Sequence, residues 1–216
     1  MGTPFTPGQL GKLQTVVNIA VATALPKVAE KYDPKVLLKA LDGRGKIFAG
    51  HLEVALEQVL DNMLILAPRG ARTVTLAERH DPDVFYRTCS GLHVWDDFRS
   101  RIVAKARPSE VGATFKIESF ELRQDLTDAE IEAALPKRHL FDETQVCAII
   151  AGLIAKQPNG EEGPLINNGY ASLFYMSSYV AHVRWRRAGS RRWSVHAWLC
   201  GGDGWNAGNQ VFFPAN

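Results

Sequence analysis

Two short runs near the end of the chain, VAHVRWR at residues 180–186 and RWSVHAW at residues 192–198, alternate between apolar and polar side chains. Successive side chains of a β-strand point to opposite faces of a sheet, so each run predicts a strand with one apolar and one polar face. The Ala-Gly-Ser at residues 188–190 has the small residues of a hairpin turn. We therefore expect an antiparallel sheet with one buried face and one solvated face. The apolar set is Ala181, Val183, Trp185, Trp193, Val195 and Ala197, and the polar set is His182, Arg184, Arg186, Arg192, Ser194, His196 and Trp198.

The segments before this hairpin predict a helical region followed by a mixed one. Apolar residues recur at helical spacing from Leu10 to Leu25, and a second amphipathic run extends from Lys46 to Leu66. Pro68-Arg69-Gly70 interrupts this pattern and is the best candidate for a boundary. Beyond it, residues 72–77 and 112–126 alternate as strands, Thr127 and Glu130 have the spacing of a capping box, and residues 142–156 form an amphipathic helix. The pattern predicts an α+β protein with a helical N-terminal region at residues 1–68 and a second domain at residues 69–216.

The composition is that of an ordinary globular protein. Of the 216 residues, 46% are hydrophobic and 22% are charged, and the net charge is +2. No apolar run approaches the roughly 20 residues that span a bilayer, and the first residues lack the pattern of a signal peptide. The three cysteines have no paired metal-binding spacing. We expect a cytoplasmic protein with no membrane partner, no metal and no cofactor.

One cluster of reactive side chains precedes the strands. His80-Asp81-Pro82-Asp83 is followed closely by Cys89 and His93, and together they suggest a metal site or a Cys/His nucleophile. The cluster has neither a His-x-x-x-His nor a Cys-x-x-Cys spacing, and Asp-Pro-Asp is typical of turns. We expect a structural role here, and a hydrolase is the weakest of the functional hypotheses.

The segment from Tyr179 onward differs in composition from the rest of the chain. It holds five arginines against a single acidic residue, four of the five tryptophans, and no lysine, glutamate or methionine. Arginines interleaved with aromatic residues are also typical of nucleic-acid-binding surfaces. An arginine-dependent nucleic-acid-binding module is therefore an alternative function for this chain.

The same segment resembles the variable region of diversity-generating retroelement target proteins. The resemblance is carried by Val-x-Trp at residues 183–185, Trp-x-Val-x-Ala at residues 193–197, and Trp-x-x-Gly-x-x-Val-Phe at residues 205–212. In that family, an error-prone reverse transcriptase copies a template repeat with substitutions at adenines, and the copy replaces the end of the variable gene. The resemblance implies a C-type-lectin-like domain with an antiparallel sheet and flanking helices, and a variable region at about residues 179–216.

The genetic code offers a physical check on this resemblance. An asparagine codon altered at its two adenines reaches most amino acids but cannot give Lys, Glu, Met, Gln or Trp. The residues expected on the polar face and in the Cys200–Gly204 loop pass this filter, whereas Trp185, Trp193 and Trp205 do not, as expected of a fixed scaffold. Trp198 is a departure, because the alternation places it on the polar face.

We therefore expect a non-enzymatic ligand-binding protein that displays a hypervariable surface, with an unknown protein as the favoured ligand and nucleic acid as the alternative. The expected ligand-binding residues are Ala181, His182, Arg184, Arg186, Arg187, Ser190, Arg191, Ser194, His196, Trp198, Cys200, Gly201, Gly202, Asp203 and Gly204.

Overall fold

The computed structural model describes residues 6–31, 64–186, 191–202 and 204–215, together with residues 35, 39, 47, 50, 51 and 54. The chain divides into two units, Met1–Leu60 and Asp61–Asn216. In the first unit, α1 (Pro7–Ala29) is a 23-residue helix on which Leu10, Val16 and Ile19 are exposed. Within the described residues, no helix combines the length and apolar character needed to span a membrane.

The second unit is built on a mixed seven-stranded sheet with the order β1-β3-β7-β4-β5-β6-β2 in the described part of the chain. The strands are β1 (Leu66–Thr75), β2 (Leu92–Val94), β3 (Thr114–Leu122), β4 (Ala171–Tyr175), β5 (Tyr179–Arg186), β6 (Arg192–Leu199) and β7 (Gln210–Pro214). Helices precede, separate and flank the strands of this largely antiparallel sheet, which is consistent with the expected α+β class. The expected antiparallel pairing is confirmed for β5 with β6, but the whole sheet is mixed, because β4 with β7 and β2 with β6 are parallel pairs.

Three helices of the second unit begin at side-chain caps. The Thr127–Glu130 capping box is confirmed at the start of α5 (Asp128–Ala134), and a second box of Asp142 and Gln145 opens α6 (Glu143–Lys156). Asp81 caps α3 (Pro82–Thr88), so the Asp-Pro-Asp sequence starts a helix. The remaining elements are α4 (Asp96–Arg101) and the short 3-10 helix η1 (Val103–Lys105).

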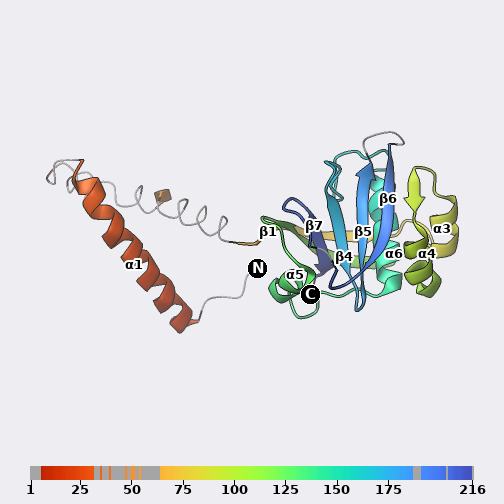
Figure 1. Cartoon of the computed structure of the whole chain (residues 1–216), viewed down its shortest axis with the longest axis horizontal. Helices are drawn as coiled ribbons and strands as arrows, with labels where there is room; N and C mark the ends of the chain where they lie inside the picture. Colours follow the sequence, from red (N-terminus) through yellow and green to blue (C-terminus); the bar gives the residue numbers. More distant parts are fainter. Residues whose placement is uncertain are drawn as a thin grey trace. The chain divides into compact units, whose positions relative to one another are not determined.

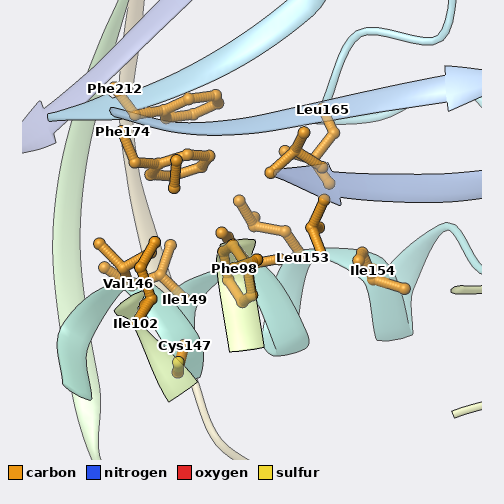
Figure 2. Packing of buried hydrophobic residues seen from close by; sticks show 14 of the residues in the cluster. Phe98, Ile102, Val146, Cys147, Ile149, Leu153, Ile154, Leu165, Phe174 and Phe212 are labelled. Carbon is orange, nitrogen blue, oxygen red and sulfur yellow. The ribbon is translucent and has the colours of Figure 1, made fainter. Parts of the chain in front are cut away.

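One face of the sheet packs on α6. Figure 1 shows α6 running behind β5 and β6, with α3 and α4 beside the β2 edge. In Figure 2, Phe174 of β4 and Phe212 of β7 point toward Val146 and Ile149 of the helix, and all four side chains are fully buried. The two phenylalanine rings stack with centroids 4.8 Å apart. Burying this apolar area is the main stabilising contribution of the second unit.

A second, smaller core covers part of the opposite face. Leu173 and Tyr175 of β4 and Val211 of β7 pack there with Ile131 of α5 and with Trp205. The sheet is therefore buried on both faces across β7 and β4, and partly so at β3. The expected solvated face is confined largely to β5 and β6.

The strand β1 begins at Leu66, inside the stretch assigned above to the helical region at residues 1–68. The Pro68-Arg69-Gly70 sequence forms a β-bulge in this edge strand, and Gly70 has a positive φ of 96°. An edge strand tolerates proline because one side of its backbone needs no ladder hydrogen bonds. The Pro68-Arg69-Gly70 sequence therefore lies in an irregular strand within the second unit.

Trp193 should contribute far more to stability than Trp198. Its ring is fully buried and its Nε1 donates a hydrogen bond to the backbone oxygen of Gln157, 2.8 Å away. We expect Trp193→Ala to lower the free energy of unfolding by about 3–5 kcal/mol, and Trp198→Ala, on a ring that is 40% exposed, by less than about half of that. Urea denaturation of the two variants compares them directly, and equal losses would contradict the assigned strand faces.

Candidate ligand-binding face

The side chains of β5 and β6 that point away from α6 form one continuous surface, which we call the β5–β6 face. The register pairs His182 with His196, Arg184 with Ser194, and Arg186 with Arg192, and Trp198 lies opposite Val180. Cross-strand pairs of this kind have Cβ atoms about 4.5–5.5 Å apart, so neighbouring side chains touch. The β5–β6 face comprises His182, Arg184, Arg186, Arg192, Ser194, His196 and Trp198.

Most of the predicted ligand-binding residues have accessible surface, with two exceptions. Ala181 belongs to the core beneath the sheet and is fully buried, so its place in the predicted site is wrong. Ser194 lies on the β5–β6 face but is 3% exposed. Arg187, Ser190 and Asp203 lie outside the described residues. The remaining predicted residues are exposed or partly exposed: His182, Arg184, Arg186, Arg191, His196, Trp198, Cys200, Gly201, Gly202 and Gly204.

The side chain that covers Ser194 is Trp95, which immediately precedes α4. Its indole Nε1 donates to Ser194 Oγ at 3.0 Å, and its ring stacks on His196 with centroids 4.5 Å apart. Trp95 is itself 41% exposed, so it extends the face beyond β6. The sequence analysis missed it because β2 and α4 reach β6 across about 100 residues of chain. One sequence feature could have pointed to Trp95, because it is the single tryptophan outside the segment from Tyr179 onward.

Stacked rings fill the other side of the β5–β6 face. The imidazole of His182 stacks on Trp198 and on Trp205, with centroids 5.2 and 5.7 Å apart. The two indoles also stack on each other at 5.1 Å. Burial among these rings, reinforced by His196 and Arg184, lowers the pKa of His182 to about 4. His182 is therefore uncharged at neutral pH.

His196 of the face and His93 of the neighbouring strand β2 also have lowered pKa values. Burial lowers the pKa of His196 and outweighs the opposing effect of Asp97, whose carboxylate is 3.8 Å away. Burial, with the charges of Arg192 and Arg186, lowers the pKa of His93. The arginines consequently supply the positive charge of this surface at neutral pH, and the histidines act there as neutral aromatic rings.

A buried carboxylate fixes the loop at the end of β6. Asp128, at the start of α5, is 4% exposed and accepts hydrogen bonds of 2.7 Å from the Tyr175 hydroxyl, from Nε1 of Trp205 and from the backbone N–H of Gly201. Burial and the nearby Asp128 raise the pKa of the Cys200 thiol to about 11, so this thiol is protonated. The Cys200–Gly204 segment is thus anchored at Gly201 and followed by an anchored Trp205.

The structure does not join His80, Cys89 and His93 into one site. His80 packs against Phe85 and Tyr86, Cys89 donates to the backbone oxygen of Ser90, and His93 contacts Trp95. Burial raises the pKa of Cys89. Among the described residues, no group of His, Cys, Asp and Glu side chains has the arrangement of a metal site.

Comparisons with protein-family models, curated proteins and solved structures find no match to this chain. The β5–β6 face and the adjacent Trp95 together present exposed guanidinium groups, two partly exposed indoles and neutral imidazoles on one sheet.

His182 should make the protein less stable in acid. Its folded-state pKa of about 4 lies below the ordinary value of 6.5, so the unfolded chain takes up the proton first as the pH falls. We expect the parent protein to lose roughly 1–3 kcal/mol relative to His182→Phe between about pH 7 and about pH 4.5. Phenylalanine preserves the ring stacking but does not titrate. Denaturation curves across this range measure the difference, and parallel pH profiles would refute the assignment.

Asp128 should determine the order of the loop after β6. In Asp128→Asn, one carboxylate oxygen becomes an amide donor, so at least one of the three donors loses its acceptor. We expect a loss of about 2–4 kcal/mol in unfolding free energy and faster amide hydrogen exchange at Gly201. The exposed Asp83→Asn is the matched control. Unchanged exchange at Gly201 would show that Asp128 does not hold the loop.

Proposed function

We propose that this protein is a non-enzymatic binding protein of the diversity-generating retroelement type, whose second unit is a C-type-lectin-like domain that presents the β5–β6 face to a ligand. The observation that carries the proposal is the separation of scaffold and surface within the C-terminal segment. Along β5 and β6, most side chains that face α6 are fully buried and most of those on the other side are accessible. A surface that varies on a constant core requires such a separation.

At most positions, burial also matches what an altered asparagine codon can encode: unreachable residues are buried and reachable ones are accessible. Trp185, Trp193 and Trp205, which cannot arise from an altered asparagine codon, are all buried in the two cores. Arg184 and Arg186, which can arise in this way, are exposed. Substitution at these two positions changes the surface while leaving the packing behind it untouched.

Two residues limit the extent of the proposed variable surface. Ser194 is buried under Trp95, so a larger side chain there must displace that ring. Trp198 is exposed but unreachable from an asparagine codon, which suits a constant aromatic residue on the face. We propose that Trp95 and Trp198 are fixed contacts flanking the variable positions at 182, 184, 186 and 196.

A protein is the favoured ligand. Tryptophan and arginine are the residues that most often dominate binding energy at protein interfaces. Both exposed tryptophans are held by ring stacking, so little side-chain entropy is lost when a partner docks on them.

One observation also favours a second candidate, the binding of single-stranded nucleic acid. Trp95 and Trp198 are exposed on a sheet that also carries exposed arginines, and bases stack on such aromatic rings. Its test is the salt dependence of affinity for a single-stranded oligonucleotide. The slope of log affinity against log salt should be about −0.7 for each phosphate neutralised, and no saturable binding at low salt eliminates this candidate.

The DNA around the gene provides a decisive test of the retroelement mechanism. We expect a near-copy of the sequence encoding residues 179–216, with adenines at the codons of positions 182, 184, 186 and 196, and a reverse-transcriptase gene close by. Absence of both features would refute the retroelement origin.

The tolerance of the β5–β6 face can be measured independently. We expect a display library randomised at His182, Arg184, Arg186 and His196 to consist mainly of folded proteins and to yield binders to several unrelated target proteins. A control library randomised at the buried residues Ala181, Val183, Val195 and Ala197 should lose folding, because each change adds or removes core volume. Equal folding in the two libraries, or no binders from the first, would contradict a diversified binding face.

A further inference from the structure

The β5–β6 face has a charged end and an aromatic end. Arg186 and Arg192 are paired across the strands at the start of β6, whereas Trp198 lies six residues further along the same strand. At a rise of roughly 3.3 Å per residue, the two ends are about 20 Å apart. A partner that lies along the face therefore meets two different kinds of contact within a short span.

The charged end holds an excess of positive charge. Arg99 of α4 lies near the paired arginines, because burial and then the charges of all three lower the pKa of His93 in the neighbouring strand β2. Asp96 is the carboxylate that opposes them at this imidazole. In the described part of the chain, no ion pair includes Arg99, Arg186 or Arg192. These three residues, which we call the arginine cluster, leave room for an anionic group from a ligand.

The pairing within the arginine cluster favours such a group. Like charges that stand directly opposite each other on antiparallel strands repel, and Arg186 is opposite Arg192. Arg186 is exposed and Arg192 is partly exposed, so a ligand can reach both side chains. An anion between two guanidinium groups replaces their repulsion by attraction. A carboxylate suits this place, because a guanidinium group binds it through two parallel hydrogen bonds.

The exposed tryptophans supply apolar contacts beside and beyond the arginine cluster. Trp95 is 41% exposed, and its ring packs edge-on against His93 with centroids 4.9 Å apart. Trp198 is 40% exposed and lies at the aromatic end. Indole rings offer large apolar surfaces, so they favour apolar or aromatic side chains of a partner.

Negative charge lies near the aromatic end. Asp128 accepts a hydrogen bond from Trp205, whose ring stacks on Trp198. Burial, followed by the charges of Asp128 and Glu132, raises the pKa of the Cys200 thiol to about 11. A nucleic-acid strand carries a phosphate at every nucleotide, so some of its phosphates would approach these carboxylates. A protein segment with acidic residues at one end only avoids that repulsion.

We propose that the β5–β6 face binds an extended acidic segment of a protein partner, with carboxylates on the arginine cluster and apolar side chains on Trp95 and Trp198. This inference rests on the proposed function, because it takes the β5–β6 face as the ligand-binding surface. It adds the chemistry of the partner that this particular chain recognises.

Panning a library of random peptides on the full chain tests the preferred chemistry without presuming a sequence. Peptides of about 12 residues are long enough to span the face. We expect the selected peptides to be enriched in Asp and Glu relative to the starting library. A matched peptide with Asn and Gln in place of Asp and Glu should bind at least roughly tenfold more weakly. No binding peptide, or equal affinity within a matched pair, overturns the proposal.

A matched pair of variants locates the carboxylate contact. Arg186→Gln removes a charge from an exposed position of the arginine cluster, and it should weaken binding of the acidic peptides at least roughly tenfold. Arg79→Gln removes the same charge from a residue beside α6 that lies 3.7 Å from Glu110, and it should change the affinity less than about twofold. Equal losses in the two variants would show a response to net charge alone and would overturn the proposal.

Trp198→Ala distinguishes failure of this inference from failure of the proposed function. It should weaken binding of the acidic peptides severalfold. Selected peptides that need Trp198 but lack acidic residues would overturn the acidic partner and keep the β5–β6 face as the binding surface. Peptides unaffected by both Trp198→Ala and Arg186→Gln would contradict the binding face itself. A single-stranded oligonucleotide that binds more tightly than the peptides and displaces them would overturn the proposal in favour of nucleic acid.

Discussion

The carboxylate of Asp128 is almost entirely buried, and a buried charge is stable only when hydrogen-bond donors surround it. Tyr175, Trp205 and Gly201 provide these donors from β4 and from the segment after β6. Trp205 in turn supports the rings of Trp198 and His182. The shape of the β5–β6 face thus depends on one carboxylate placed at the start of α5 by the Thr127 cap.

The two cores have different roles in positioning that face. The larger core fixes the strands against α6, through fully buried residues such as Phe174 and Ile149 (Figure 2). The smaller core lies on the other side of the sheet over β3, β7 and β4 and includes Val180 of β5, and it leaves Arg184 and Arg186 of β5 exposed. On this surface Arg184 and Arg186 are exposed, whereas Ser194 and His182 pack against Trp95, Trp198 and Trp205.

The local alternation was enough to predict which residues of β5 and β6 face the core, because the two-residue period of a strand is a property of adjacent residues. The spacing of Thr127 and Glu130 likewise predicted the capping box. Such local patterns did not predict the parallel pairs or the position of Trp95, since these depend on contacts between segments far apart in the sequence. The solvated face was predicted too broadly for the same reason: what covers a polar side chain such as Ser194 comes from another part of the chain. The inclusion of Ala181 in the site conflicted with the alternation, and the alternation was right.

The ring contacts of His182 restrict which side chains can occur together on the β5–β6 face. His182 touches Trp198, Trp205 and His196, and His196 touches Trp95. Substitutions at contacting positions are not additive in their free energies. The side chains acceptable at position 182 therefore depend on the residue at position 196. The charges of Arg184 and Arg186 also act on His182 and His196, respectively. Fewer combinations of side chains are therefore usable on this surface than the product of the choices at each position.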